Sequence, residues 1–208
     1  MVNLPLLSTI FIITLFSRSS YGAPSRGLGE GLTWGSNLCS DIDYVMSSTK
    51  GITWTYSWGA TPSNTSCSAF TNNQFEFVPM IWGANSISNP IYVNSLSKYL
   101  LGFNEPNAKG QSNLTPTEAA NLWPKVLGIA KKYNLSLVSP ATAGCDTTWL
   151  KQFFSACTNC EKDIVAIATH SYDCNPQGLT TCINSMTKEF NKPLWITEFN
   201  CGNGMFYR

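Results

Sequence analysis

Two glutamates, Glu105 and Glu198, each end a short apolar run, a position from which a carboxyl group can do chemistry. Pro106 disfavours helical geometry for the residue before it, so Glu105 is expected at a strand end. Two carboxyl groups at one edge of a sheet can cleave a glycosidic bond, because one donates a proton to the leaving oxygen while the other attacks the anomeric carbon or activates water. The alternative for each is a structural role, as a helix-cap partner or a salt-bridge member.

Strand alternation predicts which neighbours share a face with Glu198. Successive side chains of a strand point to opposite faces, so Glu198 is expected on the side of Leu194 and Ile196. Trp195 and Thr197 are then expected to point the other way.

Short apolar runs, several rich in Val, Ile, Trp or Tyr, predict seven strands that must position these glutamates. The predicted strands are 31–34, 53–58, 75–82, 99–104, 136–139, 164–172 and 193–199. Helical spacing of apolar residues predicts helices between the later strands. The first begins at a capping box of Thr115 and Glu118 with Pro116 at its first position, and Pro124 is expected to kink it or shift its start.

Alternating strands and helices predict an α/β fold with a parallel sheet. The sheet could be open and doubly wound, or closed as a (β/α)₈ TIM barrel. The first strand has no Gly-rich nucleotide fingerprint after it, which favours the barrel. In a barrel, the catalytic residues lie at the carboxyl ends of the strands. Several polar residues of this chain lie at predicted strand ends: Asn104, Glu105, His170, Tyr172 and Glu198.

Residues 23–208 are predicted to form one catalytic domain that is truncated at its C-terminal end. The chain continues only to Arg208 after the seventh predicted strand, too few residues for a further helix and strand. The barrel is therefore expected to be incomplete, with its eighth strand missing.

An apolar run at residues 6–16, with small residues at Ser20 and Gly22, predicts a signal peptide of residues 1–22. Residues 1–5 carry no Lys or Arg, which departs from the usual pattern, and the alternative is a buried strand or helix. The protein is thus expected to be secreted, to the extracellular space or the cell wall, with no transmembrane segment.

Eight cysteines follow this leader, and an even number in a secreted chain predicts disulfides whose pairing the sequence does not reveal. The alternative is a zinc site of Cys157, Cys160, Cys174 and Cys182. Sequons at Asn64, Asn113 and Asn134 suggest a glycoprotein.

Charge and motif content exclude several classes of function. The formal net charge is +1 and only 12% of residues are charged, which argues against a nucleic-acid partner. His170 is the only histidine, so a two-histidine zinc site is impossible, and a Ser-His-Asp triad lacks its Gly-x-Ser-x-Gly elbow. No cofactor or metal is expected.

Several motifs in order along the chain resemble a known family. They are Tyr56-Ser-Trp58-Gly59, Phe77-Val-Pro79-Met80-Ile-Trp82, Leu101-Gly-Phe-Asn104-Glu105-Pro106-Asn107, Ser139-Pro140-Ala141, His170-Ser-Tyr172 and Trp195-Ile-Thr-Glu198-Phe. This set is similar to glycoside hydrolase family 128, and the Asn-Glu-Pro context resembles clan A retaining glycosidases. The resemblance implies a β-1,3-glucanase with β-glucan as its partner.

The resemblance also implies roles for single residues. Glu105 matches the acid/base and Glu198 the nucleophile, with carboxyl groups about 5 Å apart as retention requires. Asn104 would bind the 2-hydroxyl of the sugar being cleaved. His170 and Tyr172 would line the site and help to hold Glu198 ionised.

Tryptophans divide into two predicted groups. Trp58 and Trp82, at strand ends, would be sugar platforms, although buried tryptophan is a common alternative. The remaining ones are expected in the core: Trp34, Trp54, Trp123, Trp149 and Trp195. The protein is expected to be a monomer. A different class of function is a cell-wall protein that binds β-glucan without cutting it.

Overall fold

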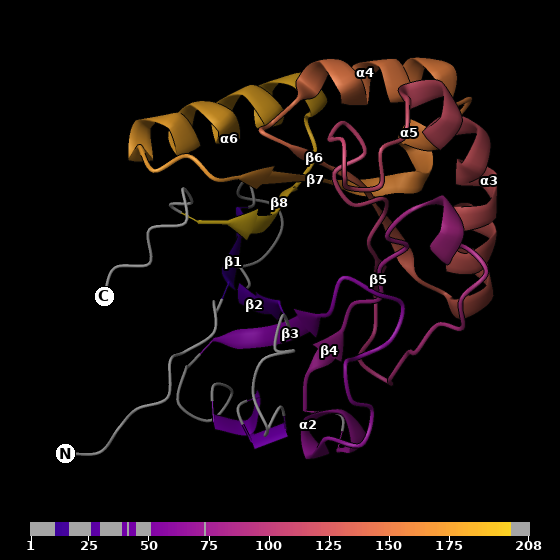
Figure 1. Cartoon of the computed structure of the whole chain (residues 1–208), viewed down its shortest axis with the longest axis vertical. Helices are drawn as coiled ribbons and strands as arrows, with labels where there is room; N and C mark the ends of the chain where they lie inside the picture. Colours follow the sequence, from indigo (N-terminus) through magenta and orange to yellow (C-terminus); the bar gives the residue numbers. More distant parts are fainter. Residues whose placement is uncertain are drawn as a thin grey trace.

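The computed structural model describes residues 11–16, 26–29, 39, 40, 42–44, 51–72 and 74–200 (Figure 1). The predicted strand 31–34, with Trp34, and also Cys201 lie outside the described residues.

Eight strands form one sheet in the order β4-β3-β2-β1-β8-β7-β6-β5. They are β1 (Phe11–Phe16), β2 (Arg26–Gly29), β3 (Ile52–Tyr56), β4 (Glu76–Phe77), β5 (Tyr99–Leu100), β6 (Ser136–Ala143), β7 (Ile164–Ser171) and β8 (Leu194–Phe199). Every pair of neighbours is parallel except the two made by β1, which runs antiparallel to β2 and to β8. The parallel α/β prediction is confirmed.

The two ends of this order, β4 and β5, also approach each other through the residues that follow them. Met80 and Leu101 form an isolated parallel bridge, and the Leu101 N–H donates to the Pro79 carbonyl at 2.9 Å. Trp195 of β8 packs against Trp54 of β3, with 5.0 Å between ring centroids. The sheet therefore curls, so that strands far apart in its order share one interior.

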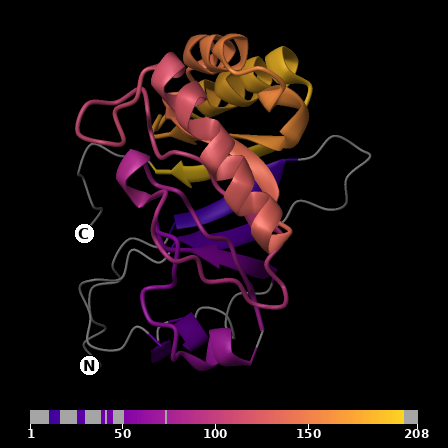
Figure 2. The same ribbon diagram turned by 90° about the vertical axis from the view of Figure 1, so that its right-hand side faces the viewer.

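Three long helices cover the outer face of the later strands: α3 (Pro116–Tyr133), α4 (Thr147–Ala156) and α6 (Pro176–Phe190) (Figures 1 and 2). The shorter ones are α2 (Ser68–Thr71), the 3₁₀ turn η1 (Ala84–Ser86) and α5 (Cys160–Asp163). The predicted capping box begins α3, with the Thr115 side chain accepting from the Glu118 N–H. Helix α3 runs unbroken through Pro124, so the predicted shift of its start does not occur.

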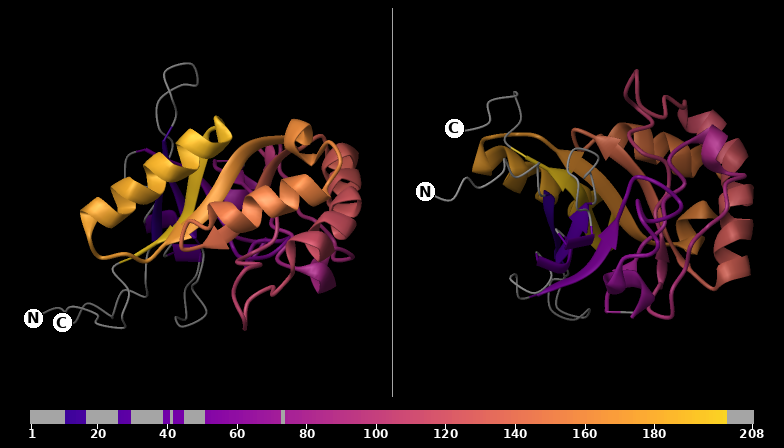
Figure 3. Two further views of the ribbon diagram at one scale, coloured as in Figure 1. Left: turned by 90° about the horizontal axis from the view of Figure 1, so that it is seen from above. Right: turned by 60° about the horizontal axis from the view of Figure 1, so that its bottom comes forward.

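Two apolar cores lie on opposite sides of the curled sheet. The outer core packs the sheet against α3, α4 and α6, and it includes Leu194, Ile196 and Trp123. The inner core gathers side chains from strands around the curl, among them Trp54 and Trp195. Further views show the helices outside the curved sheet (Figure 3). Polar side chains that rise above the inner core, at the carboxyl ends of the strands, therefore face one another.

Strand β1 lies between β8 and β2, which is the place of the eighth strand in a (β/α)₈ barrel. It contains part of the apolar run predicted as the core of the leader, and it pairs with both β2 and β8. The antiparallel direction differs from that of a (β/α)₈ barrel, in which this strand would be parallel. The leader stays a prediction.

The zinc alternative is wrong, because its cysteines form disulfides. The bonds join Cys39 to Cys67, Cys145 to Cys182, and Cys157 to Cys160, and Cys174 is also disulfide-bonded. The three sequon asparagines are exposed. Within the described part of the chain, no helix is long and apolar enough to cross a membrane.

Candidate active site

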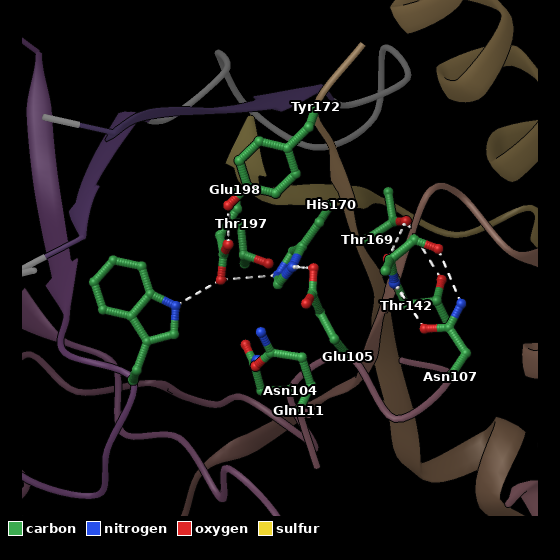
Figure 4. Close-up of polar contacts among 12 residues, drawn as sticks. Asn104, Glu105, Asn107, Gln111, Thr142, Thr169, His170, Tyr172, Thr197 and Glu198 are labelled. Atoms are coloured by element: carbon green, nitrogen blue, oxygen red, sulfur yellow. Dashed lines mark hydrogen bonds and ion pairs between the residues drawn. The ribbon is translucent and has the colours of Figure 1, made fainter. Parts of the chain in front are cut away.

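Glu105, His170 and Glu198 meet above the inner core (Figure 4). His170 Nδ1 lies 2.8 Å from Glu105 Oε1, and its Nε2 lies 3.5 Å from Glu198 Oε1. The imidazole is fully buried, and the two glutamates are 9% and 7% exposed. One ring nitrogen or carboxylate oxygen of each residue lies within 4.8 Å of those of the other two. A buried ring thus separates two carboxyl groups that both retain a little contact with solvent.

Glu198 reaches this cluster because of a register shift in β8. Ala168 pairs with Trp195 and Thr169 with Ile196, but His170 pairs with Glu198, which leaves Thr197 without an opposite residue. Such a bulge turns the following side chain to the other face. The alternation prediction that grouped Glu198 with Leu194 and Ile196 is therefore wrong. Those two side chains face the helices, whereas Glu198 lies on the inner side.

Tyr56 fixes the bulge from across the curled sheet. Its hydroxyl donates to the Thr197 carbonyl at 2.8 Å, and the residue is fully buried. Burial raises the pKa of this phenol well above its usual value, and the nearby Glu198 raises the pKa further. Tyr56 therefore keeps its proton, and remains a donor, at neutral pH.

Two side chains donate to the two oxygens of Glu198. The Trp58 indole N–H donates to Oε1 at 2.5 Å, and the Tyr172 hydroxyl donates to Oε2. Burial raises the pKa of Tyr172, and its hydrogen bond to Glu198 raises that pKa further, so the phenol keeps its proton. Donors on both oxygens fix the direction of this carboxyl group.

Glu105 has a left-handed backbone with φ of 40°, which is uncommon for a residue with a side chain. Its N–H donates to the Ala141 carbonyl of β6 at 2.8 Å, and its carbonyl accepts from the Ala108 N–H at 3.0 Å. The chain therefore turns sharply at Glu105, and β6 holds that turn. This backbone directs the carboxyl group toward His170.

Asn107 ties the same turn to the end of β6. Its amide donates to the Ala143 carbonyl at 3.0 Å and accepts from the Ala143 N–H at 2.9 Å, as a neighbouring strand would. The amide also donates to Asp146, the N-cap of α4, at 3.2 Å. Asn107 is thus a positioning residue for Glu105.

Replacing Asn107 by alanine is expected to lower kcat more than it raises KM. The lost pair of bonds to Ala143 stabilises the fold by about 1–3 kcal/mol at roughly 0.5–1.5 kcal/mol each, so the melting temperature should fall as well. Kinetics on a soluble β-1,3-glucan, the substrate that the family resemblance implies, check this expectation, with Asn89→Ala at an exposed position as the control. A variant with parental kcat and a lower melting temperature would give Asn107 a structural role alone.

Asn104 lies beneath the glutamates, 2% exposed. Its amide nitrogen donates to Gln111 Oε1 at 3.1 Å, while its Oδ1 is buried without a hydrogen-bond partner among the described residues. An unsatisfied buried acceptor is costly unless something supplies a donor. A substrate hydroxyl would be such a donor.

The predicted sugar platforms have different surroundings. Trp58 is half-buried and is tied to Glu198, so it belongs to the glutamate cluster. Trp82 is half-buried against the inner core, and its carbonyl accepts from the Asn104 N–H at 2.9 Å. The predicted core tryptophans that the structure describes, Trp54, Trp123, Trp149 and Trp195, are all buried.

The family model for the glycosyl hydrolase catalytic core matches residues 31–207. The chain belongs to this glycosyl hydrolase family. Alkali-sensitive linkage protein 1 of Schizosaccharomyces pombe is 34% identical over 179 residues, which cover 84% of this chain and 32% of that protein. The chain thus spans about a third of the length of this curated relative.

Solved structures of glycoside hydrolase family 128 share the fold. A subgroup II endo-β-1,3-glucanase from Sorangium cellulosum is 30% identical, with a TM-score of 0.65 over 77% of this chain and 70% of that one. A subgroup VII oligosaccharide-binding protein from Trichoderma gamsii is 25% identical, with a TM-score of 0.60 over 76% of this chain and 63% of that one. The resemblance to family 128 is confirmed, and the family contains both an enzyme and a binding protein.

Within this glycosyl hydrolase, Glu105, His170 and Glu198 could also hold a metal ion, and they are the only such group among the described residues. The oxygens of Glu198 already accept from Trp58 and Tyr172, and Glu105 Oε1 already lies 2.8 Å from His170 Nδ1, so a metal would have to displace some of these contacts. The cluster therefore suits acid/base and nucleophilic chemistry better than metal ligation.

Sequence reasoning missed three contributors to the site: Tyr56, Asn107 and Gln111. Tyr56 and Asn107 stand within the quoted family motifs, but neither received a role, because each acts through the backbone of a distant strand. Gln111 follows the Asn-Glu-Pro motif in a loop that has no distinctive pattern. Tyr56 holds the residue before Glu198, Gln111 holds the residue before Glu105, and Asn107 holds the turn that follows Glu105.

Proposed function

We propose that this protein is a secreted glycoside hydrolase that cleaves β-1,3-glucan with retention of configuration. The observation that carries the proposal is the pair Glu105 and Glu198, which lie on either side of buried His170. One carboxyl oxygen of each glutamate lies within 4.8 Å of one of the other, which suits the close spacing of about 5–5.5 Å typical of retaining enzymes.

In the first step, an oxygen of Glu198 attacks the anomeric carbon, and the bond from this carbon to the leaving oxygen breaks. Glu105 gives its proton to that oxygen, and a glycosyl ester of Glu198 remains. In the second step, Glu105 takes a proton from water as the water oxygen attacks the anomeric carbon. The ester bond breaks, and both carboxyl groups return to their starting states.

The surrounding side chains support this division of roles. Trp58 and Tyr172 both donate to Glu198 and so hold its two oxygens in the directions needed for attack. His170 contacts both carboxyl groups and fixes the distance between them. Asn104, whose buried Oδ1 has no partner in the described part of the chain, would accept from the sugar 2-hydroxyl, an interaction that strengthens in the transition state. Trp82 would offer its half-buried ring to a neighbouring sugar.

The whole domain, residues 23–208, is proposed to follow a signal peptide of residues 1–22 and to act as a glycosylated monomer in the extracellular space or the cell wall. Its fold is proposed to be an incomplete (β/α)₈ barrel that lacks its eighth strand. The eighth strand would belong between β8 and β2, the place that β1 takes in this chain. Exposed sequons and disulfides suit this route.

The second candidate function is β-glucan binding without cleavage. The oligosaccharide-binding protein from Trichoderma gamsii favours it, because that relative has the same fold. The arrangement of Glu105 and Glu198 around His170 favours the enzyme instead, since a binding protein has no need of two carboxyl groups around one buried imidazole.

Reducing-sugar release from soluble β-1,3-, β-1,4- and β-1,6-glucans tests the proposal. Release from the β-1,3-linked polymer alone is the expected result. If no polymer is cut, a pull-down on insoluble β-1,3-glucan separates the alternatives: a retained protein would be the binding protein, and a protein that is neither active nor retained would contradict both functions.

A further inference from the structure

A hollow of about 560 Å³ adjoins the glutamate cluster on the side of α6. Its walls are the loop after β6, the end of β7 and the first turns of α6. Tyr172 lines the hollow and also donates to Glu198, so one side chain contacts both places. The volume lies within the range of about 300–1,000 Å³ typical of small-ligand sites.

Covalent and backbone constraints fix the shape of this hollow. The disulfide between Cys145 and Cys182 joins the loop after β6 to α6, and both cysteines line the hollow. Gly144 and Cys145 have left-handed backbones, with φ of 69° and 60°, which turn the loop at the rim. The walls are therefore held in place without a ligand.

Gly178 allows the Asp173 carboxylate to lie against the first turn of α6. A Cβ atom at Gly178 would stand 1.8 Å from Asp173 Oδ2, so any larger residue would displace the carboxylate. Asp173 Oδ1 accepts from the Asn175 N–H at 2.8 Å, which fixes the direction of the group. The carboxylate thus faces the hollow as an oriented acceptor.

The remaining lining is rich in hydroxyl groups and carries no Lys or Arg among the described residues. Thr181 and Ser185 donate to carbonyls of α6 at 2.8 Å, so their oxygens can still accept from a ligand. Tyr172, 41% exposed, adds part of an aromatic ring. Acceptors beside an aromatic ring suit a neutral ligand with many hydroxyl groups, and they do not suit an anion.

We infer that this hollow is a sugar subsite, which holds one glucosyl unit of the bound β-glucan beside the unit at the glutamates. The inference rests on the proposed function for the identity of the sugar. Asp173 accepts from the sugar hydroxyls, Tyr172 contacts the ring, and the disulfide-bonded wall limits the unit's orientation. The subsite makes affinity depend on chain length.

Two neighbouring threonines of α6 provide the test. Thr181 lines the hollow and Thr180 does not, although both are exposed and both donate to the carbonyl four residues earlier, at 2.8 and 2.9 Å. Thr181→Trp would fill the hollow, and Thr180→Trp is the matched control. Each is placed in a Glu198→Gln chain, so that the ligand is not consumed, and calorimetry measures the affinity for laminaribiose and laminarihexaose.

Thr181→Trp is expected to weaken binding of laminarihexaose roughly tenfold, the loss of one or two hydrogen bonds, and to change laminaribiose binding much less. Thr180→Trp should leave both affinities at their parental values. Equal hexaose affinity in all three chains would overturn the inference, as would a parent that binds both sugars alike. If Thr181→Trp lowers the melting temperature sharply, Asp173→Ala removes the carboxylate and is judged by the same two affinities.

Failure of the inference and failure of the proposed function remain distinguishable. A chain with intact Glu198 that cuts β-1,3-glucan, but binds hexaose equally with or without Thr181→Trp, keeps the function and loses the subsite. A chain that cuts nothing, but loses hexaose affinity only in Thr181→Trp, keeps the subsite and loses the hydrolase.

Discussion

Glu198→Gln is expected to lower the rate of β-1,3-glucan cleavage by roughly 10³-fold or more, the scale of losing a catalytic nucleophile. The amide has nearly the same shape as the carboxylate, and its one oxygen can still accept from Trp58 or from Tyr172, which donate to different oxygens of Glu198. Its oxygen is a far weaker nucleophile, so the glycosyl ester cannot form. Reducing-sugar release from purified chains measures the loss.

The control for Glu198→Gln is Glu189→Gln. Glu189 forms an exposed ion pair with Lys151 at 3.3 Å and takes no part in the glutamate cluster. Its replacement should therefore leave the rate within about twofold of the parental value. Both variants should keep the parental melting temperature to within a few degrees. Parental cleavage by Glu198→Gln would exclude Glu198 as the nucleophile.

Glu105→Gln is expected to lower the rate on the same glucan by about 10²–10⁴-fold, the contribution of general acid/base catalysis. The loss should depend on the leaving group. With a dinitrophenyl β-glycoside, whose leaving oxygen needs no proton, the first step is spared and only the second is slow. A burst of dinitrophenol at the start of the reaction is therefore expected.

Azide gives Glu105→Gln an independent test. The anion needs no general base, so it should restore turnover of the dinitrophenyl substrate and yield a β-glycosyl azide, with Glu198 still forming the ester. In Glu198→Gln, azide attack occurs directly on the substrate and would yield the α-azide. The opposite assignment of the two anomers would exchange the roles of Glu105 and Glu198.

Much of the site could be predicted from strand ends. The carboxyl ends of parallel strands meet at one edge of a sheet, so Glu105, His170 and Glu198 could be placed together from the apolar runs before them. The direction of Glu198 could not, because it depends on the bulge at Thr197, whose carbonyl accepts from Tyr56 across the curled sheet. Local alternation contains no sign of such a distant contact.

The order of strands in the curled sheet was equally beyond the sequence pattern. Periodicity identified strands such as 164–172 and 193–199, but it cannot tell that 11–16 pairs between β2 and β8. Cysteine pairing is a property of folded geometry, so the even count predicted disulfides without their partners. The long-range contacts that orient the glutamates, such as that of Asn107 with Ala143, also depend on the folded geometry, so the sequence pattern could not predict them.

The anomeric configuration of the first product tests the two-glutamate mechanism most directly. Proton spectra recorded during the first minutes of laminarihexaose cleavage, before mutarotation mixes the anomers, should show the β anomer rising first. An α anomer that rises first would mean direct displacement by water and would contradict Glu198 as the nucleophile. A spectrum unchanged over hours would contradict cleavage itself.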